Sequence, residues 1–105
     1  MDSGWIGVDL DGTLALYDGF KGSNHIGEPI PKMIERVKQW RASGLTVKIF
    51  TARADDPKSI PYIEKWCLEH LGEILPITNV KDFDMIELWD DRCVQVIKNT
   101  GEVVR

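Results

Sequence analysis

Apolar runs and amphipathic stretches alternate along the first two thirds of the chain. Residues 5–10 and 45–50 are almost continuously apolar and are bounded by glycine or polar residues, which is typical of strands buried on both faces. Residues 31–42 and 60–71 carry apolar side chains at helical spacing. A proline in the first turn and a glycine after the last turn suit each helix. The pattern predicts strand, helix, strand, helix in this order.

Short apolar runs return at 74–77, 86–89 and 93–97, and a last run at 102–104 also predicts a strand. Strands that alternate with helices indicate a three-layer α/β/α, Rossmann-like fold with a mainly parallel sheet. The 105 residues, 43% of them hydrophobic, suffice for one core. We therefore expect a single domain over residues 1–105.

Residues 15–29 break this alternation. They contain three glycines and mixed polar and aromatic residues without a sustained period. Ordering such a loop costs entropy and adds little core, so long loops in small domains are more often functional than not. We interpret this segment as a loop or small hairpin and call it the flap.

Charge and cysteine content narrow the classes of partner and compartment. A net charge of −4 and a pI near 5.1 argue against a general polyanion-binding surface, so nucleic acid is expected only as a substrate. Cys67 and Cys93 lie in apolar surroundings without metal-ligand spacing, which predicts buried free thiols and a reducing compartment. No basic leader and no membrane-length apolar run is present in the sequence. A cytoplasmic location without membrane association is the resulting expectation.

Polar side chains follow three of the predicted strands. They are Asp9, Asp11 and Thr13 after the first strand, Thr51 and Arg53 after the second, and Asp90, Asp91 and Arg92 after a late one. In an open parallel sheet, ligands bind at the carboxyl ends of the strands. Clustered carboxylates without histidine or cysteine suit a hard cation such as Mg²⁺. A hydroxyl, a cation and the nearby Lys81 would together cradle a phosphoryl group.

The stretches DLDGTL, FTAR, Lys81 and WDDR resemble, in this order, the four motifs of the haloacid dehalogenase-like (HAD) superfamily, specifically its capless Mg²⁺-dependent phosphatases. The resemblance spans Asp9 to Asp91. It implies a phosphomonoester hydrolase in which Asp9 is the nucleophile and forms an aspartyl-phosphate. Asp11 would protonate the leaving oxygen and then activate water.

The same resemblance implies the ligands of phosphate and metal. Thr51 and Lys81 would hold the phosphoryl oxygens. Magnesium would be bound by the side chain of Asp9, the main-chain carbonyl of Asp11 and the side chain of Asp90. Asp91 would act either as a ligand through water or as a support outside the ligand set.

Several assignments stay open at this level. Arg53 and Arg92 are placed either to bind substrate or to pair with the surplus carboxylates. His25 is more often unremarkable than functional in such a loop, and the four tryptophans favour core packing over base stacking.

The function also has alternatives. One is a phosphate-responsive signalling or binding module without turnover. Receiver domains, however, place their acidic pair on the first strand and their Thr and Lys on late strands, an order that differs from this one. The substrate is a small phosphate ester, a phosphoprotein or a polynucleotide end phosphate, and closure of the site by the flap or by a homo-oligomeric neighbour is left open.

Overall fold

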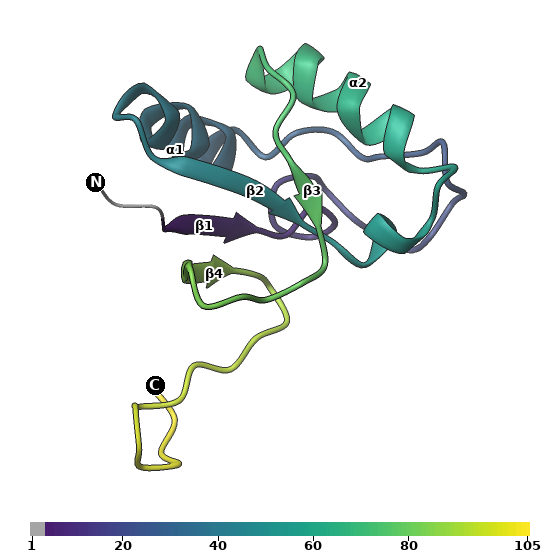
Figure 1. Ribbon diagram of the computed structural model, residues 1–105. Coiled ribbons are helices and arrows are strands. Elements are labelled where there is room, and N and C mark those ends of the chain that lie inside the picture. Colours follow the sequence, from purple (N-terminus) through teal and green to yellow (C-terminus); the bar gives the residue numbers. More distant parts are fainter. Residues whose placement is uncertain (1–3) are drawn as a thin grey trace.

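The computed structural model describes residues 4–105 and contains a four-stranded, all-parallel sheet with the strand order β3-β2-β1-β4 (Figure 1). The strands are β1 (Trp5–Val8), β2 (Thr46–Phe50), β3 (Ile77–Thr78) and β4 (Met85–Trp89), and the helices are α1 (Pro31–Ala42), the 3-10 helix η1 (Ala52–Asp55) and α2 (Ile60–Leu71). The predicted α/β fold with a Rossmann-like parallel sheet is confirmed. Both α-helices have the bounds that the sequence predicts.

Helices α1 and α2 contact one another and cover one face of the sheet (Figure 1). The core between the helices and the sheet contains Ile6 and Val8 of β1 and Val47 and Ile49 of β2. All four residues of β1 are buried, as its continuous apolar run predicts for a central strand. The tryptophans pack as expected: Trp5 and Trp66 are buried, and Trp40 and Trp89 pack edge to face at 5.1 Å beside the core.

The connection from β3 to β4, residues 79–84, reverses the direction in which strands are added. β2 and β3 lie on one side of β1, whereas β4 pairs with β1 on the other side. The indole N–H of Trp5 donates to Asp82 Oδ1 at 2.8 Å and fixes this connection to the sheet. The reversal creates a switch point between β1 and β4, the place where open parallel sheets bind ligands.

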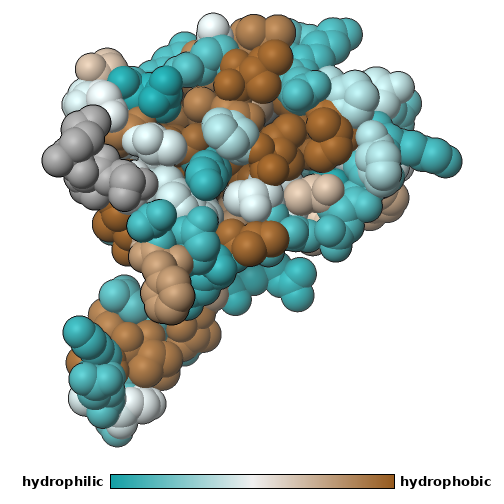
Figure 2. Space-filling view, in the orientation of Figure 1, coloured by the Kyte–Doolittle hydropathy of each residue, from teal (hydrophilic) through white to brown (hydrophobic). Residues whose placement is uncertain are grey.

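Residues 93–105 differ from the prediction. The expected strands at 93–97 and 102–104 do not join the sheet but pair with each other, through a bridge between Val96 and Val103 and a hydrogen bond from Val104 N to Gln95 O at 2.9 Å. This C-terminal arm projects from the body of the molecule (Figure 1) and carries both apolar and polar surface in Figure 2. Alternating apolar residues predict a strand but not its partner, and here the partner is the nearest segment in sequence.

Two smaller expectations are also corrected. The strand expected at 74–77 is only the two-residue β3, which begins at Ile77, and Leu75 before it is buried in the core. Cys67 is buried as predicted, but the prediction for Cys93 is wrong because the residue begins the projecting arm and is exposed.

Candidate functional site

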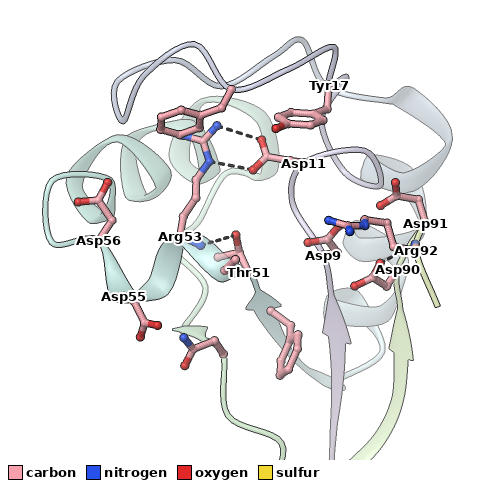
Figure 3. A pocket seen from close by; sticks show the side chains of 14 residues that line it. Asp9, Asp11, Tyr17, Thr51, Arg53, Asp55, Asp56, Asp90, Asp91 and Arg92 are labelled. Carbon is pink, nitrogen blue, oxygen red and sulfur yellow. Dashed lines mark hydrogen bonds and ion pairs between the residues drawn. The ribbon is translucent and has the colours of Figure 1, made fainter.

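The parallel pairing of β1 with β4 brings two distant acidic stretches together. Val8 lies opposite Trp89 in the register, and the N–H of Asp9 donates to the carbonyl of Trp89 at 2.9 Å. The next residues, Asp9 and Asp90, therefore leave the sheet side by side. One carboxylate oxygen from each of Asp9, Asp90 and Asp91 lies within 4.8 Å of the other two (Figure 3). The sequence predicted this convergence from the strand ends alone.

Thr13 and Gly12 fix the position of Asp91. The hydroxyl of Thr13 donates to Asp91 Oδ1 at 3.1 Å and accepts the N–H of Asp91 at 2.9 Å. Gly12 has a φ of +93°, and a Cβ at this position would lie 2.6 Å from Asp91 Oδ2. Only glycine tolerates both the left-handed backbone and this approach. The DGT part of DLDGTL thus holds the third carboxylate of the cluster in place.

Burial, together with the neighbouring carboxylates, raises the pKa of Asp9 from 3.8 to about 7. Burial is the largest cause, followed by the negative charge of Asp90 and then by the hydrogen bond with Asp91 and its charge. Ionising all three carboxylates without a cation is therefore unfavourable. A divalent cation relieves both causes, and a donor set made only of oxygens fits Mg²⁺. A Mg²⁺ ion therefore suits the donor set made by Asp9, Asp90 and Asp91.

Asp11 is turned toward a different partner. Its two oxygens accept hydrogen bonds from Nε and Nη2 of Arg53 at 2.8 and 3.1 Å (Figure 3). The Arg53 side chain is only 7% exposed, so this ion pair is shielded from solvent. Thr51 lies at the start of η1, and its hydroxyl accepts the N–H of Arg53 at 3.1 Å. Arg53 thus pairs with a site carboxylate, one of the two roles that the sequence left open.

A cavity of about 870 Å³ joins these groups. The described residues that line it are Asp9, Asp11, Tyr17, Phe20, Phe50, Thr51, Ala52, Arg53, Asp55, Asp56, Asn79, Asp90, Asp91 and Arg92. Every predicted site residue except Lys81 is among them. Lys81 is exposed on the connection 79–84, outside the cavity lining, and Asn79 of the same connection lines the cavity instead. The structure therefore gives no support for Lys81 as a phosphate ligand.

The flap borders the cavity and is fastened to the body at several points. A bridge between Ala15 and Pro29 closes its base, and the indole N–H of Trp66 donates to Gly27 O at 3.0 Å. Near its tip, Ser23 Oγ donates to Asp56 Oδ2 at 2.5 Å. The segment is a loop with a paired base, as the sequence predicted. His25 is exposed and lies outside the cavity lining.

Seven lining residues were not singled out as site residues from the sequence: Tyr17, Phe20, Phe50, Ala52, Asp55, Asp56 and Asn79. Aromatic residues inside a glycine-rich loop that follows a candidate catalytic strand are a usable signal for the first two. Asn79 follows β3 directly, and the rule that ligands meet strand ends would have found it. The positions of Asp55 and Asp56 at the cavity depend on the turn made by η1, and the hydrophobic pattern of the sequence did not predict this turn.

Comparisons with known proteins bear on the fold. No protein-family model matches the chain, and no curated protein sequence matches it. Among solved structures, the chain is similar to a conserved protein of Bacteroides thetaiotaomicron, with a TM-score of 0.66 and 23% identity over 86% of this chain and 77% of that chain. This likeness supports the α/β fold alone. Within residues 4–105, neither α-helix combines the length and apolar character that a membrane-spanning helix needs.

Proposed function

We propose that this chain is a Mg²⁺-dependent phosphomonoesterase that works through an aspartyl-phosphate on Asp9. The observation that carries the proposal is the convergence of Asp9, Asp90 and Asp91 at the carboxyl ends of β1 and β4. The ordered resemblance to the HAD phosphatases supports it. Asp9, Asp90 and Asp91 would hold the cation, which when bound neutralises charge on the phosphoryl oxygens and favours the ionised form of Asp9.

The proposed reaction has two steps, with Asp9 as the nucleophile and Asp11 as the acid and then the base. An oxygen of ionised Asp9 attacks phosphorus, and the bond from phosphorus to the ester oxygen breaks as Asp11 gives that oxygen a proton. Water then attacks the phosphorus of the aspartyl-phosphate and loses a proton to Asp11, which releases inorganic phosphate and regenerates Asp9. Arg53 donates a hydrogen bond to each oxygen of Asp11, so Asp11 takes up a proton more readily once one of these bonds is released. An arriving phosphate, which attracts the guanidinium, supplies a reason for that release.

Phosphoryl oxygens would be held by groups at the cavity wall. Thr51 offers a hydroxyl at the end of β2, and Arg53 and Arg92 offer guanidinium groups. Lys81 is exposed on its connection and lies outside the cavity lining. We therefore assign the charge-neutralising role to the two arginines rather than to Lys81.

The test is hydrolysis of an aryl phosphate by the purified protein. We expect phosphate release with Mg²⁺, none in excess EDTA, and none from Asp9→Asn, while Asp84→Asn, which alters an exposed carboxylate outside the cavity, keeps the wild-type rate. With a radiolabelled phosphate ester, Asp11→Asn should retain label on the protein and Asp9→Asn should not. Equal turnover in EDTA would refute the metal assignment.

A phosphate-binding module without turnover is the second candidate. The observation in its favour is the ion pair that engages both oxygens of Asp11 and keeps them from a leaving group. Such a module would bind inorganic phosphate with Mg²⁺ yet release none from any ester. Turnover that depends on Asp9 excludes it.

A further inference from the structure

The cavity has a second part that the proposed chemistry does not use. Its lining includes the three clustered carboxylates, called the floor below, and also aromatic rings from the flap and from β2, called the rim: Tyr17, Phe20 and Phe50. A volume of about 870 Å³ lies within the roughly 300–1,000 Å³ of pockets that enclose a whole small molecule. The cavity is therefore larger than the phosphoryl group requires, and the rim is available for the remainder of a substrate.

The flap rings are exposed although the flap itself is fastened. Tyr17 is 50% and Phe20 is 63% exposed. The guanidinium of Arg53 lies 5.3 Å from the ring centre of Phe20, and Arg53 Nη1 is 3.5 Å from Gly22 O, so the flap tip is tied to the residue that also holds Asp11. Figure 3 shows Tyr17 above Asp11 at the edge of the cavity. Two partly exposed rings on an anchored loop offer a surface on which a flat ring can stack.

The charges around the cavity limit what else the substrate can carry. Among the described lining residues, six are aspartates and two, Arg53 and Arg92, are basic. Arg53 is already paired with Asp11, and a divalent cation would offset only part of the charge of the floor cluster. Asp55 and Asp56 add negative charge at η1. A second or third phosphate would thus meet repulsion without a basic partner to compensate it.

We propose that the site selects small phosphomonoesters whose body is a flat, uncharged ring system stacked on Tyr17 and Phe20, and that it discriminates against polynucleotide ends. A preference measured as kcat/KM rests on the proposed phosphatase activity. Binding of a ring by the flap does not require turnover. Nucleoside 5′-monophosphates and other ring-bearing monophosphates share the required chemistry. The acidic wall disfavours the polynucleotide alternative that the sequence left open.

The kinetic experiment compares four substrates with Mg²⁺: adenosine 5′-monophosphate, uridine 5′-monophosphate, glycerol phosphate and a 5′-phosphorylated single-stranded oligonucleotide. We expect kcat/KM to be at least about tenfold higher for one or both ring-bearing monophosphates than for the other two. Tyr17→Ala should lower that preference roughly tenfold by raising KM, whereas Tyr17→Phe retains it. Leu16→Ala, a similarly exposed flap position outside the cavity lining, is the matched control.

A binding experiment separates this inference from the phosphatase proposal. Calorimetry with Mg²⁺ on Asp11→Asn, which keeps the three clustered carboxylates and slows turnover, measures the affinity for the same four compounds. If no ester is hydrolysed by wild type but the ring-bearing compounds still bind and lose about tenfold in affinity with the Tyr17→Ala change, the activity fails and the ring subsite stands. If hydrolysis occurs but glycerol phosphate or the oligonucleotide is preferred, or Tyr17→Ala leaves every ratio unchanged, the ring subsite is refuted while the activity stands.

Discussion

Replacing Asp9 by Asn should stabilise the metal-free protein at neutral and alkaline pH, although Asp9 is the proposed nucleophile. The folded chain raises the Asp9 pKa from 3.8 to about 7 through burial and the charges of Asp90 and Asp91. At ~1.4 kcal/mol per pH unit, the ionised carboxylate opposes folding by at most about 4 kcal/mol. Asp9 is partly exposed, and solvent screens part of this repulsion. We expect a gain on the order of 2 kcal/mol from the substitution.

The sign of the pH dependence follows from the raised pKa. Between about pH 4 and pH 7 folded Asp9 retains a proton that the unfolded chain has released, so the free energy of unfolding falls as pH rises through this window. Below about pH 4 the group is protonated in both states and the effect disappears. An Asn side chain is neutral throughout. The gain from Asp9→Asn should therefore be largest above about pH 7 and smaller near pH 5.

The assay is urea unfolding in EDTA, followed by tryptophan fluorescence, at about pH 5 and about pH 8. Asp84→Asn, which neutralises an exposed carboxylate away from the cluster, controls for the general loss of a negative charge. Saturating Mg²⁺ should reverse the order at the higher pH, because wild type gains the free energy of metal binding. If Asp9→Asn is no more stable than wild type in EDTA at about pH 8, the three carboxylates do not repel one another as described.

Three further predictions follow from the geometry. Asp11→Asn should slow turnover by about 10² or more and leave Mg²⁺ affinity within about twofold in a calorimetric titration, because the Asp11 side chain pairs with Arg53 rather than with the carboxylate cluster. Shortening the flap between residues 17 and 24 should raise KM for the true substrate and leave the melting temperature nearly unchanged, since these residues add little to the core; unchanged kinetics would mean that the flap does not close the site. In native protein, a thiol reagent should modify Cys93 but not buried Cys67. Partial burial of the thiol and then the charge of Asp90 raise the Cys93 pKa. Mg²⁺ should accelerate the reaction of Cys93, because the cation offsets the charge of Asp90.

The helices and the acidic cluster could be predicted because their signals are local or follow from topology. Proline in the first turn and glycine after the last turn mark both α-helices, and Gly72 indeed ends α2 in a left-handed conformation. The carboxylates follow apolar strands, and parallel strands end at the same edge of a sheet. Sequence order and strand ends together were enough to bring Asp9 and Asp90 into one site.

Other features depend on long-range choices that no local pattern encodes. The ion pair of Asp11 and Arg53 joins residues 42 positions apart, and the sequence could not decide between that pairing and substrate binding. Lys81 fits a motif by order, but its position depends on the path that residues 79–84 take around the sheet. The C-terminal arm has the alternation of a strand, and alternation does not specify whether the sheet or a neighbouring segment provides the partner.

The register of β4 against β1 is what turns two ordinary acidic stretches into one site. Val8 pairs with Trp89, so Asp9 and Asp90 leave the sheet at the same level, and the N–H of Asp9 bonds to the carbonyl of Trp89. A slip of one residue would turn Trp89 away from Trp40 of α1 and would move Asp90 out of step with Asp9. The packing of Trp89 that stabilises the fold therefore also fixes the spacing of the carboxylates. A change at Trp89 should disturb metal binding although its side chain lies on the helix-covered face, away from the cavity lining.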